Sequence, residues 1–186
     1  MRFVEAHNEP GRLLLGLESG HLINHSDFKS NSNRKIFFPF GHELSGSTAT
    51  SVSALSSSPL MKDLFCVGYA SGEVRLFSSL NRDWCALKLW SFSNTIISIA
   101  WSPVRASVFY MLDCHGLVRV MDILDDTESV WDSHHIESDD QLTRINTSCQ
   151  IMYGGYLSGK VVQFVLRTPE NDIDESVELR LHLKLK

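Results

Sequence analysis

The sequence predicts an all-β fold made of successive four-stranded antiparallel sheets. One observation is a repeat, because a shift of 44 residues places Gly72 on Gly116 and a further shift of 43 places Gly116 on Gly159. A weaker copy centres on Gly20. The second observation is that apolar residues on both sides of each glycine recur at every second position, which is the period of a strand and not of a helix. Repeats of this length are typical of sheets stacked side by side.

Each repeat predicts four strands in the same order. The first strand ends at a Ser-Pro pair, Ser58-Pro59 or Ser102-Pro103, because proline lacks the amide hydrogen that a sheet needs. The second and third strands flank the glycine, where a positive φ permits a tight hairpin. A fourth strand follows, as in the alternating residues 85–90 (CALKLW). The expected units are 1–45, 46–90, 91–133 and 134–186.

The C-terminal residues 177–185 also alternate, since Val177 and every second residue after it are apolar. This period predicts the outer strand of the last sheet. A helix is the alternative, because Leu, Glu, Arg and Lys are all good helix formers.

Composition and charge argue against several classes of partner. The 186 residues are 43% hydrophobic and 21% charged, with a formal net charge of −5, which is typical of a globular protein. Nucleic acid or an anionic membrane would require clustered Lys and Arg, so neither is an expected partner. The N-terminus lacks the apolar centre of a signal peptide, so we expect an intracellular protein whose four cysteines are free thiols.

No pattern points to catalysis, a cofactor or a metal ion. The acidic segment 122–140 contains His134 and His135, but adjacent residues of a strand point to opposite faces and would not easily share one ion. Cys114 and His115 lie in a predicted hairpin without a third group to orient them for catalysis. We therefore expect a protein that is not an enzyme.

The repeats resemble those of WD40 β-propellers. Residues 99–103 (IAWSP), 71–78 (SGEVRLFS) and 115–122 (HGLVRVMD) look like the first-strand and third-strand boxes of that family. Met121-Asp122 stands where the Trp-Asp pair that names the family would stand, although no unit has the literal pair there. The resemblance implies that residues 1–186 form a partial WD40 β-propeller of about four blades.

Among WD40 proteins, the repeats look most like those of dynein intermediate chains. Residues 99–124 are similar to a "W-S-P-x-R-P-x-V-F" motif that ends in "I-W-D-L", and residues 13–26 resemble an earlier "V-G-x-E-x-G" blade. Residues 64–78 resemble the blade between these two. The C-terminal ELRLHLKLK looks closest to the intermediate chain of cytoplasmic dynein 2.

This resemblance implies a non-catalytic subunit of a motor complex. In that family the propeller contacts the tail of a dynein heavy chain, an N-terminal arm recruits light chains, and dynein 2 drives retrograde intraflagellar transport in cilia. The expected partners are therefore the heavy chain and other dynein subunits. This sequence does not contain the light-chain arm, so we expect no light-chain binding. The expected location is the cytoplasm and the cilium. The alternative is a generic WD40 scaffold or adaptor in ubiquitin ligation or trafficking.

Propellers bind partners mainly through loops on one rim, so the hairpins at the glycines are the candidate site. Three residues before these glycines lie Leu17, Tyr69, Asp113 and Tyr156. Tyrosine rings offer a large contact area, and we take Tyr69, Asp113 and Tyr156 as candidate partner-binding residues. Trp84, beside charged residues at the start of a strand, is a fourth candidate.

Overall fold

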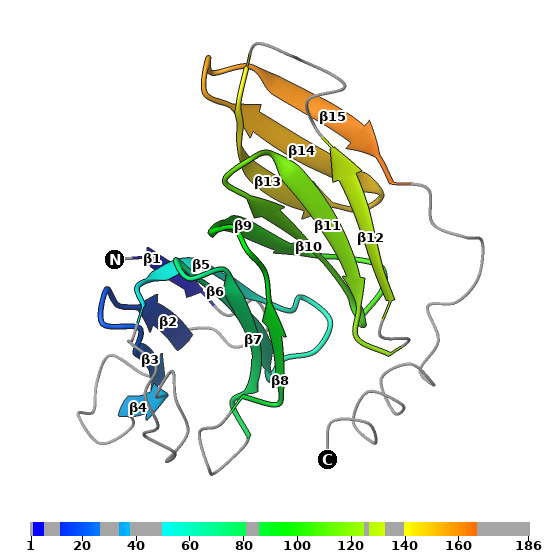
Figure 1. Cartoon of the computed structure of the whole chain (residues 1–186). Helices are drawn as coiled ribbons and strands as arrows, with labels where there is room; N and C mark the ends of the chain where they lie inside the picture. Colours follow the sequence, from blue (N-terminus) through cyan, green and yellow to red (C-terminus); the bar gives the residue numbers. More distant parts are fainter. Residues whose placement is uncertain are drawn as a thin grey trace. The chain divides into compact units, whose positions relative to one another are not determined.

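The computed structural model describes residues 2–5, 12–26, 34–37, 50–80, 86–124, 127–132 and 140–166. Every regular element in these ranges is a β-strand, and the strands form four antiparallel sheets (Figure 1). Counting the described strands, three of the sheets have four strands and one has three. The predicted all-β, partial β-propeller of about four blades is therefore confirmed.

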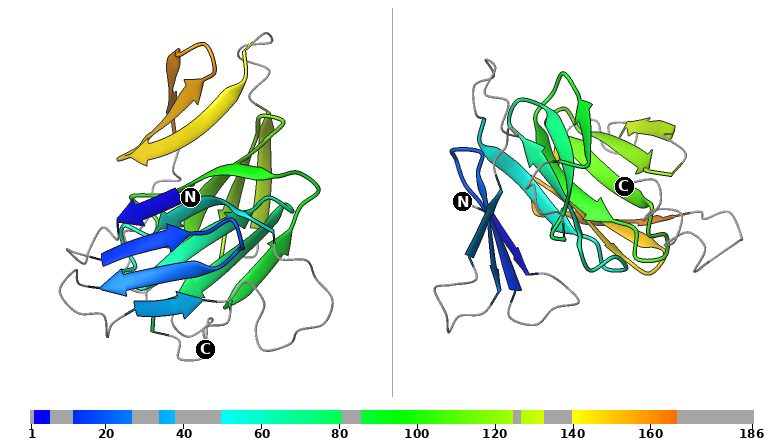
Figure 2. Two further views of the ribbon diagram at one scale, coloured as in Figure 1. Left: turned by 90° about the vertical axis from the view of Figure 1, so that its left-hand side faces the viewer. Right: turned by 90° about the horizontal axis from the view of Figure 1, so that it is seen from below.

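The chain forms two compact units, Met1–Ile96 and Ile97–Lys186. The first unit contains two sheets with the strand orders β1-β2-β3-β4 and β5-β6-β7-β8. Figure 2 shows the strands of the first of these sheets side by side. Their bounds are Arg2–Glu5 (β1), Arg12–Gly16 (β2), Leu22–Ser26 (β3), Arg34–Phe37 (β4), Val52–Ser57 (β5), Leu64–Tyr69 (β6), Glu73–Ser78 (β7) and Lys88–Ser91 (β8).

The second unit holds the other two sheets, with the strand orders β9-β10-β11-β12 and β13-β14-β15. In every sheet, each strand pairs with the strand next to it in the sequence, as the repeated hairpins predict. The bounds are Ile96–Trp101 (β9), which starts at the unit boundary, Val108–Asp113 (β10), Leu117–Asp122 (β11), Thr127–Asp132 (β12), Leu142–Ser148 (β13), Ile151–Tyr156 (β14) and Val161–Val165 (β15).

The Ser-Pro pairs close the turn after the first strand of a sheet. The Ser58 hydroxyl accepts a hydrogen bond from the Met61 amide (3.0 Å), and the Ser102 hydroxyl accepts one from the Arg105 amide (3.1 Å). Each serine therefore satisfies a turn amide that has no partner in the sheet ladder. The two turns use the same device because the sequence repeats the same pair.

The four hairpin glycines have the positive φ that the sequence predicts. The angles are 81° at Gly20, 88° at Gly72, 82° at Gly116 and 89° at Gly159. Gly72 is also enclosed, since a Cβ atom added there would lie 2.2 Å from the carbonyl oxygen of Phe92. Only glycine fits both its backbone conformation and its surroundings.

The second strand of the two best-packed sheets is buried on both of its faces. All six residues of β6 and all six of β10 are buried. A one-sided sheet would bury every second residue, so these strands lie in sheets that are covered on both sides. Among the described residues, each unit contains an apolar core. The first contains Leu14, Leu22, Val52, Leu55, Phe65, Val67, Tyr69 and Phe77. The second contains Ala100, Val108, Tyr110, Leu112, Val118, Leu142, Ile145, Met152 and Tyr156.

Hydrogen bonds join the two sheets of the second unit. The Ser98 hydroxyl, on β9, donates to the carbonyl oxygen of Ile145 (3.3 Å) and accepts from its amide (3.2 Å), on β13. The Gln141 side-chain amide donates to the Cys114 carbonyl (2.9 Å). The core between these sheets is thus bordered by polar contacts that fix how the two sheets align.

Two strand predictions need correction or lie outside the described residues. The strand expected at 85–90 begins only at Lys88 and ends at Ser91. Ala86 and Leu87 precede the strand, and Cys85 is not among the described residues. The strand expected at 177–185 also lies outside them. The fourth sheet therefore ends at β15 in the described part of the chain.

Candidate partner-binding hairpins

The predicted binding residues occupy the same place in each hairpin. The hairpin tips are residues 17–21, 70–72, 114–116 and 157–160. In each one, the glycine amide donates a hydrogen bond to the carbonyl oxygen of the residue three positions earlier, at 3.0 to 3.1 Å. That residue is therefore the first residue of the turn. It stands where the strand ends, at the base of the hairpin. In the first tip, where the corner is Leu17, the His21 ring bonds the Ser19 hydroxyl (2.9 Å).

Tyr69 lies inside its sheet and is only 1% exposed. The Arg75 guanidinium lies 5.5 Å from the centre of its ring and forms a 2.7 Å ion pair with Glu73. The Tyr69 hydroxyl has no hydrogen-bond partner in the structure. Burial raises the pKa of Tyr69 well above its usual range, which the charge of Arg75 offsets only in part. Tyr69 therefore stays protonated and packs the base of the second hairpin.

Asp113 holds the third hairpin together. Its carboxylate accepts hydrogen bonds from the amides of His115 (2.9 Å) and Leu117 (3.1 Å). The other carboxylate oxygen lies 3.8 Å from the guanidinium of Arg119. Aspartate side chains often stabilise turns by accepting a hydrogen bond from the amide two residues further on, and Asp113 does so here. Asp113 itself is 1% exposed.

Tyr156 repeats the arrangement of Tyr69 in the fourth sheet. It is 4% exposed, and its hydroxyl has no hydrogen-bond partner in the structure. Burial raises its pKa, and the negative charge of Asp140 raises it further. Asp140 in turn accepts hydrogen bonds from the hydroxyl and the amide of Ser158, at the tip of the hairpin. The tip of this hairpin is thus tied to the preceding connection.

The three described candidates lie in different sheets, and each is buried at the base of its own hairpin. Trp84 lies outside the described residues. The exposed surface of the hairpins belongs to their tips, which include Ser71, His115 and Leu157. Leu157 is 74% exposed. Partner binding by Tyr69, Asp113, Tyr156 and Trp84 stays a prediction.

Sequence reasoning missed two features of the hairpins. Arg75 and Arg119, each three residues after a hairpin glycine, cross back to the residue at the base of the turn. The signal was present in the repeated strings SGEVR and HGLVR. The other feature is the exposed apolar surface of the last sheet, where Val161 is 65% and Val165 is 77% exposed.

The described residues do not gather the groups that a metal site needs. Within them, no three His, Cys, Asp or Glu side chains come together, and the His134-His135 pair lies outside them. The same part of the chain contains no helix long and apolar enough to cross a membrane. The carboxylates of Asp113 and Asp140 accept hydrogen bonds from residues of the hairpins.

Comparison with known proteins gives one informative match. No protein-family model matches the chain. Over 122 residues, which are 63% of the chain, it is 26% identical to cytoplasmic dynein 2 intermediate chain 1 of Mus musculus. The chain is related to a dynein intermediate chain. The matched region spans 12% of the length of the mouse protein, so the relation to the dynein intermediate chain concerns a small part of that protein.

Proposed function

We propose that the chain is a non-catalytic WD-repeat subunit of a dynein complex, namely cytoplasmic dynein 2, and that it contacts a dynein heavy chain. The observation that carries the proposal is the 26% identity to the mouse dynein 2 intermediate chain over 122 residues. The four successive antiparallel sheets support it, because stacked blades of this kind present loops to partner proteins. On the same proposal, the chain supports retrograde intraflagellar transport and cilium assembly. It would act in the cytoplasm and the cilium.

The use of the polar side chains favours a binding role over catalysis. A catalytic acid or base needs a pKa near the working pH and access to a substrate. Tyr69 is buried and protonated, and the Asp113 carboxylate accepts two amides of its own turn. These side chains stabilise hairpins, and stable hairpins present their tips in a fixed conformation at little entropic cost to binding.

We place the heavy-chain contact on the hairpin tips, with Tyr69, Asp113 and Tyr156 as the residues that position them and Trp84 as a further contact. Leu157 is the strongest contact candidate among the tips. Its side chain is 74% exposed, so a partner that covers it would remove apolar surface from water. His115, exposed at the third tip, is the polar counterpart.

The test is affinity capture of the tagged full chain from ciliated cells, with quantitative mass spectrometry of the recovered proteins. We expect dynein 2 heavy chain and other dynein subunits, with at least about 5-fold less heavy chain for Leu157→Asp, a loss of about 1 kcal/mol. Leu80→Asp is the matched control, since Leu80 is 66% exposed but lies in the turn after β7, at the opposite end of its sheet from the hairpin.

Two results would contradict the proposal. Recovery of ubiquitin-ligase or coat components without any dynein subunit would favour the generic scaffold. Equal losses of heavy chain for Leu157→Asp and Leu80→Asp would place the contact elsewhere than on the tips.

A further inference from the structure

The two faces of the last sheet differ in what packs on them. On the face that we call inner, Phe164 packs against the core of the second unit, and a Cβ atom added at Gly154 would lie 2.7 Å from a methyl carbon of Leu142. The neighbouring Gly155 points to the other face, which we call outer. Apart from its chain neighbours, the only described atom within 4 Å of a Cβ added there is the Cβ of Arg144, at 3.7 Å. The inner face is therefore filled at the two glycines, whereas the outer face is open.

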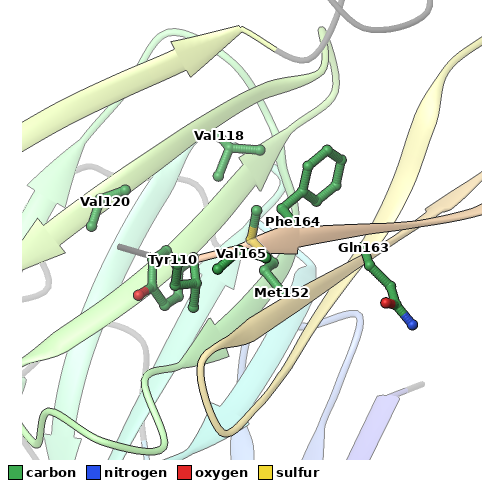
Figure 3. A pocket seen from close by; sticks show the side chains of 8 residues that line it. Tyr110, Val118, Val120, Met152, Gln163, Phe164 and Val165 are labelled. Atoms are coloured by element: carbon green, nitrogen blue, oxygen red, sulfur yellow. The ribbon is translucent and has the colours of Figure 1, made fainter. Parts of the chain in front are cut away.

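A cavity of about 460 Å³ lies between the two sheets of the second unit. Tyr110 lines it from the β9-β10-β11-β12 sheet, and Met152, Gln163 and Phe164 line it from β14 and β15 (Figure 3). No described residue of β13 lines it, and neither does Gly155. The open position at Gly155 is therefore separate from this cavity.

One row of residues crosses the outer face at this open position. Arg144, Gly155 and Val161 lie opposite one another on β13, β14 and β15. Arg144 is exposed and Val161 is 65% exposed, so the glycine leaves a space between a cation and an apolar side chain. Thr143 is the extra residue of a bulge just before Arg144, and its hydroxyl donates a 2.9 Å hydrogen bond to the Gly155 carbonyl. We call these four residues the Gly155 row.

The second sheet contains the same arrangement with the space filled. Ala54 follows the bulge of β5 and lies opposite Gly68, as the corresponding residues do in the Gly155 row. A Cβ atom added at Gly68 would lie 3.1 Å from the Cβ of Ile96, which is fully buried. Ser53, the extra residue of this bulge, donates a 2.6 Å hydrogen bond to the Ile96 carbonyl. A strand glycine often marks such a close approach, and here it admits a β-branched side chain whose backbone is held by the bulge hydroxyl.

The Gly155 row differs from this arrangement in its charge. Arg144 stands where the second sheet has Ala54, which is only 2% exposed. None of the residues of β13, β14 and β15 is acidic, so the sheet is positive in a chain whose formal net charge is −5. A ligand of this row should therefore bring a carboxylate as well as an aliphatic side chain.

We propose that the Gly155 row binds an extended segment of a partner protein in which isoleucine or valine stands next to an acidic residue. The branched side chain fills the space over Gly155 and contacts Val161, and the carboxylate pairs with Arg144. The hydroxyl hydrogen of Thr143 goes to the Gly155 carbonyl, and the hydroxyl oxygen accepts a hydrogen bond from a backbone amide of the segment. The proposal depends on the geometry of the last sheet and not on the relation to dynein.

Two other occupants fit the row less well. A second copy of this chain cannot offer its own Ile96 segment, because that side chain is fully buried in its own fold. A two-fold contact between two outer faces would bring two Arg144 side chains together, and like charges repel. A helix uses its backbone amides and carbonyls within itself, whereas an extended segment has them available for the Thr143 hydroxyl.

The test uses the segment that fills the second sheet as its probe. A capped peptide with the sequence of residues 93–100 (SNTIISIA), carrying Ile97→Glu next to the Ile96 anchor, is titrated into the ¹⁵N-labelled full chain. The control peptide carries Ile97→Lys. We expect saturable NMR shifts of the Gly155 and Val161 amides, and at least about 3-fold tighter binding of the acidic peptide.

Exchange of the charge and filling of the space separate the two parts of the site. Arg144→Glu should reverse the preference, so that the lysine peptide binds at least about 3-fold tighter. Gly155→Val should weaken both peptides about 10-fold, because its side chain takes the place of the anchor. Ser148→Glu is the matched control, since Ser148 is exposed on the same strand and the same face as Arg144, and it should leave the preference unchanged.

Three results would overturn the proposal. One is that neither peptide shifts the Gly155 amide. Another is that both peptides bind equally to the natural chain and to Arg144→Glu, which would remove the role of the charge. The third is a dimer of the natural chain that Arg144→Glu dissociates, as seen by analytical ultracentrifugation, because a second copy would then occupy the row.

Discussion

Gly72 and Gly159 have nearly the same backbone conformation, with φ of 88° and 89°, but only Gly72 is enclosed. A Cβ atom at Gly72 would lie 2.2 Å from the Phe92 carbonyl oxygen and 2.8 Å from that of Asn94. At Gly159 nothing lies within 4 Å of the same atom. Substitution by alanine therefore separates the cost of the backbone conformation from the cost of the steric clash.

The magnitudes follow from these contacts. Placing alanine at a positive φ costs about 1–2 kcal/mol, which both variants share. In Gly72→Ala the Phe92 segment must also move, which breaks the 3.1 Å hydrogen bond from the Phe92 amide to the Gly72 carbonyl and loses packing, for about 2 kcal/mol more. We expect Gly72→Ala to be destabilised by about 3–4 kcal/mol and Gly159→Ala by about 1–2 kcal/mol.

The assay is native-state hydrogen exchange read peptide by peptide, since the chain has two units and a single unfolding curve would mix them. A difference of about 2 kcal/mol corresponds to roughly 30-fold faster exchange, so the β6–β7 amides of Gly72→Ala should accelerate that much more than the β14–β15 amides of Gly159→Ala. Equal acceleration in the two variants would refute the enclosure of Gly72 by its neighbours.

Three further predictions concern buried polar groups. Ser98→Ala removes both hydrogen bonds to Ile145 and should destabilise the second unit by about 1–2 kcal/mol, seen as faster exchange in β9 and β13. Asp113→Ala should accelerate exchange of the β10–β11 hairpin amides, whereas Asp113→Asn, which still accepts an amide, should do so less. Tyr69→Phe should be neutral or stabilising because the hydroxyl is buried without a partner, and it should also reduce the loss of stability above about pH 10.

The sign of the pH effect follows from the direction of the shift. Burial raises the pKa of Tyr69 in the folded chain above the value of an unfolded tyrosine, about 10. Below that pH both states are protonated, and the preference of the fold for the neutral ring is fully present. As the pH rises beyond it, the unfolded state releases its proton first, so the free energy of unfolding falls. A urea series between pH 8 and pH 11, read by chemical labelling of the buried Cys66 thiol, reports on the first unit alone. An unchanged dependence on pH in Tyr69→Phe would contradict the reasoning.

The strand order of the fold could be predicted from local signals. Period two, the Ser-Pro pairs and one glycine in each repeat are properties of short segments, and β5–β7 and β9–β11 follow them closely. The complete burial of β6 and β10 could not be predicted in this way. It depends on what packs on each face of the sheet, which is not encoded in the strand itself.

The same limit explains the site residues. Tyr69 and Tyr156 look like interface residues in the sequence because they stand beside a turn, yet their rings fold back into the sheet. Asp113 could have been assigned from its sequence, since an Asp at the first corner of a turn commonly accepts the amides that follow it. The exposed Leu157 carries no such local signal, because any turn residue can be covered or uncovered by its neighbours.

Direct binding to a dynein heavy chain is the simplest test of whether this chain is a dynein subunit. The purified full chain is titrated against the purified tail of a dynein 2 heavy chain, with binding followed by an optical biosensor. We expect saturable binding that Leu157→Asp weakens by at least about 5-fold and that Leu80→Asp leaves intact. Absence of binding by a chain whose β-sheet circular dichroism shows it to be folded would contradict the assignment to a dynein complex.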